Sequence, residues 1–170
     1  PDAPILLFSL GKCNLNAKHI ISIVGTRHAS HYGKSFVDSF VEDITQSLDD
    51  VVIVSGLAYG IDILAHKACI DKNAPTAAVL AHGLNTIYPT SHRSYAAEIV
   101  HCNGSLITEY TSQTHINKGN FVARNRIVAS LSDCTVVVES AEKGGALITA
   151  QLASSYNRDV FAVPGRTSDE

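Results

Sequence analysis

Short runs of β-branched and other apolar residues recur along the chain, and each is continuous rather than alternating with polar residues. Such runs are typical of strands covered on both faces, as in a parallel sheet. We therefore predict strands at Ile20–Val24, Val51–Ser55, Thr76–Leu80, Ser105–Thr108, Thr135–Glu139 and Val160–Val163. Longer segments between them carry apolar residues three and four positions apart, which is the helical repeat. These predict helices at Gly33–Leu48, Ile61–Asp71, Tyr95–His101, Phe121–Leu131 and Ala146–Tyr156.

The alternation of strand and helix is typical of an α/β protein with a doubly wound, mostly parallel sheet and helices on both faces. We expect one such domain at 20–166, a connecting segment at 1–19 and a tail at 167–170, with any flanking domains outside this chain. Ligands of doubly wound sheets bind outside the carboxyl ends of the strands, where helix N-termini present free backbone N–H groups. The glycine-bearing loops after the first, second and fifth predicted strands are therefore the places to look for a site.

Charge narrows the choice of partner. The formal net charge of −3 is not that of a protein with a cationic coat, so any binding to phosphates requires a local basic cluster. Residues 111–132 supply one, because they include Lys118, Arg124 and Arg126 but no Asp or Glu. Since no apolar run is long enough to cross a bilayer and no secretory signal opens the chain, we expect a cytoplasmic protein without a membrane partner.

Several familiar sites are excluded by the residues present. The turn after the first strand lacks G-x-G-x-x-G, and the chain contains neither a GxxxxGK[ST] loop nor a G-x-S-x-G nucleophile elbow. Asp62 and His66 lie one helical turn apart, but no third ligand follows at metal spacing. We interpret that pair as a structural hydrogen bond, and we expect no metal, no cofactor and no catalytic residue.

The basic segment also carries an aromatic residue. Phe121 lies among its cations, and single-strand binders combine cations for the phosphates with rings on which bases stack, although this ring could equally belong to the core. Arg124 and Arg126 are two positions apart and cannot share one helix face. We therefore expect one of them to pair with a carboxylate inside the protein and the other to reach solvent.

Two further positions are suited to bind an anion. Arg27 directly follows the first strand, close to the start of the next helix, although a salt bridge across the sheet edge would also explain it. Lys143 and Gly144 precede the last helix and could bind phosphate through free backbone N–H groups, or could form only a tight turn.

Taken together, a series of short motifs resembles the DNA-processing protein A (DprA, also called Smf) family over nearly the whole chain. The matching segments are Val24–Arg27, Ser55–Asp62 with Ala65 and His66, Ile87–Pro89, Phe121 with Arg124–Ile127, Val137–Glu139 and Ala162–Gly165. The combination of SGxAxGIDxxAH with a later RNRI and a final AVPG is highly specific.

The resemblance implies an extended Rossmann-like domain that binds single-stranded DNA and forms a homodimer. It also implies that the protein protects incoming DNA and loads the RecA recombinase during natural transformation and recombination. By position, the implied DNA contacts are Arg27, Gly56, Lys118, Phe121, Arg124 and Asn125. The sequence departs from the family at Tyr59, where an arginine is frequent, so the resemblance implies a basic pocket with one positive charge fewer.

Two other functions remain open at this point. The same architecture resembles nucleoside-monophosphate phosphoribohydrolases of the lysine-decarboxylase-like group, but the turn at 144–150 lacks the carboxylate that such a hydrolase needs. Only Glu139 and Glu142 could replace it. A module that binds protein partners alone is the third possibility, because a sequence does not distinguish a DNA groove from a groove for an acidic partner.

Overall fold

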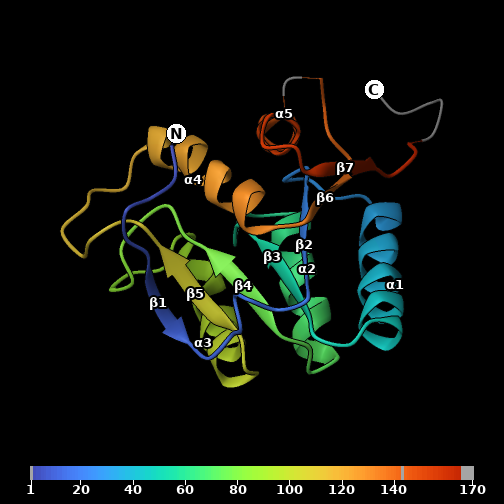
Figure 1. Ribbon diagram of the computed structural model, residues 1–170, viewed down its shortest axis with the longest axis horizontal. Helices are drawn as coiled ribbons and strands as arrows, with labels where there is room; N and C mark the ends of the chain where they lie inside the picture. Colours follow the sequence, from blue (N-terminus) through green and yellow to red (C-terminus); the bar gives the residue numbers. More distant parts are fainter. Residues whose placement is uncertain (1, 143, 166–170) are drawn as a thin grey trace.

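The computed structural model describes residues 2–142 and 144–165, and over these residues it forms a seven-stranded sheet with helices on both faces (Figure 1). The strands are β1 (Phe8–Gly11), β2 (His19–Gly25), β3 (Val51–Ser55), β4 (Thr76–Val79), β5 (Ser105–Thr108), β6 (Cys134–Val138) and β7 (Asp159–Ala162). Their order across the sheet is β1-β5-β4-β3-β2-β6-β7, and only β1 runs antiparallel to its neighbour.

The helices form two layers. They are α1 (His31–Ser47), α2 (Ile61–Asp71), α3 (Arg93–His101), α4 (Lys118–Leu131) and α5 (Gly145–Ser155), with a short 3₁₀ helix, η1 (Thr90–His92), before α3. Helices α1, α2 and α3 pack beside one another on one face of the sheet, and α4 and α5 pack together on the other (Figure 1). The predicted doubly wound α/β fold with helices on both faces is confirmed.

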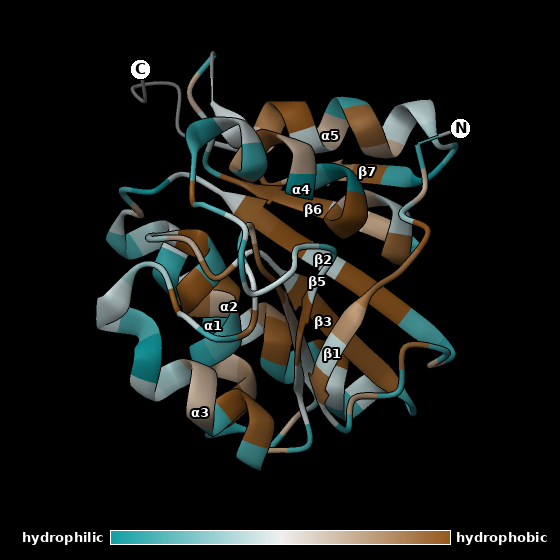
Figure 2. Ribbon diagram, turned by 90° about the vertical axis from the view of Figure 1, so that its left-hand side faces the viewer, coloured by the Kyte–Doolittle hydropathy of each residue, from teal (hydrophilic) through white to brown (hydrophobic). Residues whose placement is uncertain are grey.

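Strand β2 shows why the central strands read as continuous apolar runs. Ile21 and Ile23 belong to the core under α1 and α2, whereas Ile20 and Val24 belong to the core under α4 and α5. Because successive side chains of a strand point to opposite faces, both sets must be apolar when both faces are covered. Figure 2 shows these hydrophobic strands between the two layers of helices, which carry both hydrophilic and hydrophobic residues.

The two edges of the sheet differ from the sequence prediction. The segment 1–19, expected to be a connector, contributes β1 to the sheet and packs Leu7 and Leu15 against the core under α4 and α5. Strand β7 was predicted to be covered on both faces, which is wrong: all four of its residues are exposed, with Phe161 at 57%. A short edge strand has one neighbour only, and its apolar sequence does not reveal that.

The order of the strands fixes where a ligand can bind. From β2 the chain winds in one direction through β3 and β4 to β5, and then returns to place β6 on the other side of β2. The connections that leave β2 and β6 therefore pass to opposite faces, which opens a crevice at the carboxyl ends of these strands. Among the described residues, no helix is both long and apolar enough to span a membrane.

Candidate nucleic-acid interface

A pocket of about 260 Å³ occupies this crevice. Its walls come from the loops that follow β2, β3 and β6 and from the facing sides of α4 and α5. Six of the eight residues predicted to contact DNA line it: Arg27, Gly56, Phe121, Arg124, Asn125 and Gly144. Residues as far apart in the sequence as Arg27 and Gly144 thus meet at one place, as the parallel topology requires.

The other two predicted residues are not part of this wall. Lys118 is exposed and begins α4, one turn before Phe121, so it lies at the approach to the pocket rather than in its wall. Lys143 lies outside the described residues.

Arg124 forms the floor of the pocket and is 4% exposed. Its Nη1 donates hydrogen bonds to the carbonyl oxygens of Gly56 and Val79, and its buried Nε has no partner within the described structure. Burial lowers the pKa of this guanidinium, while the nearby Asp62 carboxylate opposes the shift. Burial likewise raises the pKa of Asp62, and Arg124 counteracts that rise. The floor is thus a buried arrangement of opposite charges.

Gly56 gives the floor its room. A Cβ at this position would fall on the Arg124 guanidinium and within 2.5 Å of Asp62 Oδ2. The glycine is therefore required because two buried charged groups pass next to its Cα, with its carbonyl accepting from one of them. This is a structural reason for Gly56 at the site, independent of any contact with a ligand.

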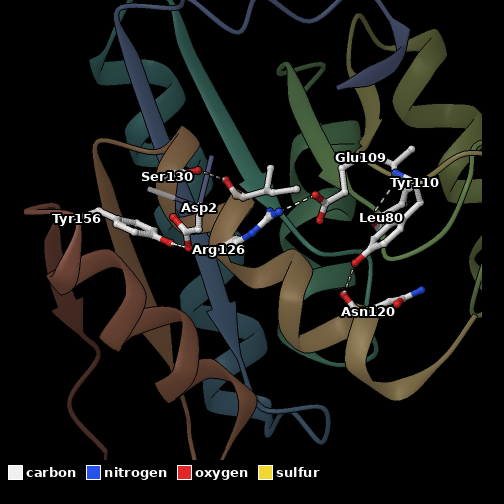
Figure 3. Close-up of polar contacts among 10 residues, drawn as sticks. Asp2, Leu80, Glu109, Tyr110, Asn120, Arg126, Ser130 and Tyr156 are labelled. Carbon is white, nitrogen blue, oxygen red and sulfur yellow. Dashed lines mark hydrogen bonds and ion pairs between the residues drawn. The ribbon is translucent and has the colours of Figure 1, made fainter. Parts of the chain in front are cut away.

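The second arginine of the RNR motif points away from the pocket. Arg126 Nη2 lies 2.6 Å from Glu109 Oε2, and both side chains are about four-fifths buried (Figure 3). The neighbouring Tyr110 hydroxyl donates to the Asn120 carbonyl oxygen at 3.5 Å, which ties the strand β5 exit to the first turn of α4 (Figure 3). The prediction that one arginine pairs internally is confirmed for Arg126, but the prediction that the other reaches solvent is wrong, because Arg124 is buried.

Arg27 is the exposed cation of the pocket, and no described residue forms an ion pair with it. Its loop is held on both sides: Thr26 N–H donates to the Glu139 carbonyl oxygen at 2.6 Å, and Thr26 oxygen accepts from Ile61 N–H at 3.0 Å. Gly60, at φ 76°, allows the close approach, since a Cβ there would meet the backbone of Arg27. The guanidinium is thus carried by a fixed loop with its charge open to the solvent.

Glu139 holds the same loop in place through hydrogen bonds. Its carboxylate accepts from the backbone N–H of Ser30 at 2.9 Å and from the Ser30 hydroxyl. The same hydroxyl accepts from the N–H groups of Tyr32 and Gly33 and caps α1. One candidate carboxylate for a hydrolase is therefore used in positioning the Arg27 loop, and it does not line the pocket.

The aromatic residue of the basic segment lies at the rim. Phe121 lines the pocket and is partly buried, and its ring packs edge-to-face on Tyr88 with centroids 5.4 Å apart. Asn125, one turn further along α4, donates a long 3.5 Å hydrogen bond to the Gly145 carbonyl oxygen. The exposed apolar side chains of Val122 and Ile148 complete the rim.

The Asp62 and His66 pair is structural, but not through a mutual bond. His66 is fully buried, and its Nδ1 lies 2.8 Å from Thr76 Oγ1. The Thr76 hydroxyl donates its single proton to the Ile53 carbonyl oxygen, so Nδ1 of His66 must carry the proton that joins the two side chains. The unprotonated Nε2 has no partner among the described residues, and burial lowers the pKa of His66 to about 3. Within the described part of the chain, no group of acidic, His or Cys side chains could hold a metal ion.

Sequence reasoning missed several parts of the site. Asp62 was interpreted only as half of a pair with His66, yet it lines the pocket beside Arg124. Its signal was available, because Asp62 belongs to the SGxAxGID motif that also supplies Gly56. Val122 and Ile148 carried no signal, since an apolar residue on an amphipathic helix is expected in the core.

The fold and the pocket define a Rossmann-like α/β domain with a cationic crevice at the carboxyl edge of its sheet. Residues 1–170 match the model of the DNA recombination-mediator protein A family, so the chain belongs to the DprA/Smf family. It is 40% identical to the DNA processing protein DprA of Bacillus subtilis over 169 residues, covering 99% of this chain and 56% of that protein.

Solved structures of DNA processing protein A have the same fold. DNA processing protein A from Helicobacter pylori superimposes with a TM-score of 0.89 at 32% identity, covering 98% of this chain and 75% of that one, and its binding of single-stranded DNA has been described as a unique mode. DprA from Streptococcus pneumoniae superimposes with a TM-score of 0.89 at 35% identity, covering 99% and 58%. The chain spans roughly half the length of the curated relatives that it matches.

Proposed function

We propose that this chain binds single-stranded DNA along the carboxyl edge of its sheet. The observation that carries the proposal is the convergence of Arg27, Phe121 and the α5 N-terminus on one pocket. The exposed guanidinium and the backbone N–H groups that begin α5 provide two ways of binding a phosphate, and the ring at the rim provides a surface for a base. Lys118 adds a second exposed cation one turn from that ring.

The contacts divide into two kinds. Arg124 supports the floor from within and cannot reach the solvent, so its contribution is to the shape and field of the pocket rather than to direct capture of a phosphate. Arg27 and Lys118 are free to move toward a strand. With about two phosphates neutralised by these cations, log K is expected to fall with log[salt] at a slope of roughly −1.4, from ~0.7 per phosphate on a single strand.

Binding without hydrolysis is part of the proposal. The Glu139 carboxylate is engaged by Ser30, and Asp62 is held in the floor next to Arg124. Neither is presented to the pocket as a free general base, and a hydrolase of nucleoside monophosphates requires one. Glu142, the other carboxylate named above, is exposed and does not line the pocket. These placements support a binding protein over the enzyme alternative.

The cellular role follows from the family. We propose that the protein acts in the cytoplasm, protects incoming single strands and helps to load RecA recombinase onto them in transformation and recombination. We also propose a homodimer. The exposed Val160 and Phe161 on edge strand β7 support it, because an apolar edge strand is a surface suited to pairing with a second copy.

The test is fluorescence-polarisation binding of labelled oligo-dT at two salt concentrations, with duplex competitor. Arg27→Ala and Lys118→Ala are each expected to weaken binding roughly tenfold or more and to flatten the salt slope by about 0.7. Lys12→Ala is the matched control, because Lys12 is an exposed lysine next to Gly104 at the opposite edge of the sheet. Wild-type protein that fails to bind oligo-dT at low salt would exclude the proposal.

A further inference from the structure

Two half-exposed tyrosines lie beside the pocket but outside the basic segment from which the site was predicted. Tyr88 is 48% exposed and Tyr59 is 49% exposed. The Tyr88 ring packs on Phe121 and therefore continues the aromatic surface of the pocket rim outward. Neither ring belongs to the hydrophobic core clusters of the described residues.

Tyr59 is exposed and yet held in place. Its ring packs edge-to-face on His92 with centroids 4.9 Å apart, and its hydroxyl lies 3.4 Å from Ser91 Oγ. His92 is itself buried, and its Nδ1 donates to the Leu57 carbonyl oxygen at 2.9 Å. A ring that is fixed before a ligand arrives loses little conformational entropy when a base stacks on it.

The position of Tyr59 links it to the pocket. The preceding residue, Ala58, lines the pocket, and the following residue, Gly60, packs against the backbone of Arg27. Tyr88 and the contacts of Tyr59 both belong to the segment 88–92, which includes η1. We use the term aromatic arc for Phe121, Tyr88 and Tyr59. Phe121 packs on Tyr88 at the start of this segment, and Tyr59 packs on His92 at its end.

The charge pattern of the arc suits a polyanion. Residues 72–97 contain no Asp or Glu, and they encompass the whole segment 88–92. Arg93, which begins α3 directly after His92, is exposed. A strand crossing the arc would thus meet an exposed cation and no carboxylate from this segment, which is the combination found where single strands are bound with little sequence preference.

We propose that the single strand continues from the pocket over the aromatic arc, with bases stacked on Tyr88 and Tyr59 and the backbone passing Arg93. This inference rests on the proposed function, since it extends the binding site for the same ligand. It assigns to Tyr59 a contribution from base stacking.

The experiment compares oligo-dT with an oligonucleotide of the same length in which every base is removed. Tyr59→Leu and Tyr88→Leu are each expected to weaken binding of oligo-dT roughly tenfold, the equivalent of ~1–3 kcal/mol per stacked base, and to leave binding of the abasic strand unchanged. Tyr59→Phe keeps the ring and is expected to bind oligo-dT like the wild type.

Intrinsic fluorescence provides a second readout, because the chain has six tyrosines and no tryptophan. Stacking quenches tyrosine emission, so Tyr59→Phe is expected to retain affinity but lose part of the quenching by oligo-dT. Tyr156→Phe is the control, since Tyr156 follows α5 at the end opposite the pocket and bonds to Asp2.

The outcomes are distinct. Leucine variants that bind oligo-dT as tightly as wild type, or that lose equal affinity for both strands, would overturn the aromatic arc while leaving single-strand binding in the pocket intact. A wild-type protein that binds neither strand at low salt would overturn the proposed function together with the arc.

Discussion

Replacing Arg124 by leucine is the sharpest test of how the pocket is built. The change removes two charge-assisted hydrogen bonds, to the carbonyl oxygens of Gly56 and Val79, and withdraws the positive charge that opposes the burial of Asp62. Each such bond contributes about 1.5–3 kcal/mol, so the expected loss in the free energy of unfolding is roughly 3–6 kcal/mol. For a domain of this size that is a fall in Tm of roughly 6–24 °C.

The loss should depend on pH with a definite sign. Burial already holds the pKa of Asp62 above its ordinary value, and without Arg124 that pKa rises further. When the pKa of a carboxyl group is higher in the folded state than in the unfolded state, the group stabilises the native state fully at pH values below the unfolded-state pKa. This stabilisation is lost as the pH rises through the folded-state pKa. The Arg124→Leu variant should therefore recover part of its stability as the pH is lowered from neutral toward about 4.

Urea unfolding followed by circular dichroism at pH 7 and at a mildly acidic pH measures both effects. Arg93→Leu is the matched control: it removes an exposed arginine at the start of α3 that forms no ion pair with any described residue, and it should change the free energy of unfolding by no more than about 0.5 kcal/mol. Equal losses for the two variants, or a loss for Arg124→Leu that does not change with pH, would refute the account of the floor as a buried arrangement of charges.

Two further predictions concern Gly56 and the buried His66. Gly56→Ala should cost roughly 1–3 kcal/mol and weaken oligo-dT binding, because the added methyl group displaces Arg124 and Asp62; unchanged urea unfolding and polarisation curves would contradict this. His66, with a pKa lowered to about 3, binds fewer protons in the native state than in the unfolded state between about 6.5 and 3, so stability should fall as the pH is lowered through this window. His66→Gln should show a flatter profile of urea midpoint against pH, and a profile parallel to that of wild type would count against the buried neutral imidazole.

Much of the site was accessible from the sequence because the fold repeats one simple unit. Parallel strands read as continuous apolar runs, so the carboxyl ends of β2, β3 and β6, and the loops that follow them, could be located without coordinates. The motifs at Arg27 and Gly56 mark the loops after β2 and β3, and Phe121 belongs to α4; all three residues line the pocket. Local patterns sufficed wherever the property in question was itself local.

Only the tertiary structure decided which arginine of the RNR motif is buried in the pocket floor and which forms an ion pair. Arg124 and Arg126 are indistinguishable by composition and spacing, and only the positions of Val79, Asp62 and Glu109, all distant in the sequence, make one the pocket floor and the other half of an ion pair. The edges of the sheet were decided in the same way: β7 has an apolar sequence like an inner strand but only one neighbour, and β1, whose sequence alternates apolar and small residues, is a strand only because it pairs with β5. The amino-acid sequence by itself determined the family, the order of the five helices and of six of the seven strands, and the loops that carry the site. Long-range packing determined the pairing of β1, the burial of the arginines and the arrangement of the aromatic arc, because these depend on residues that only the folded chain brings together.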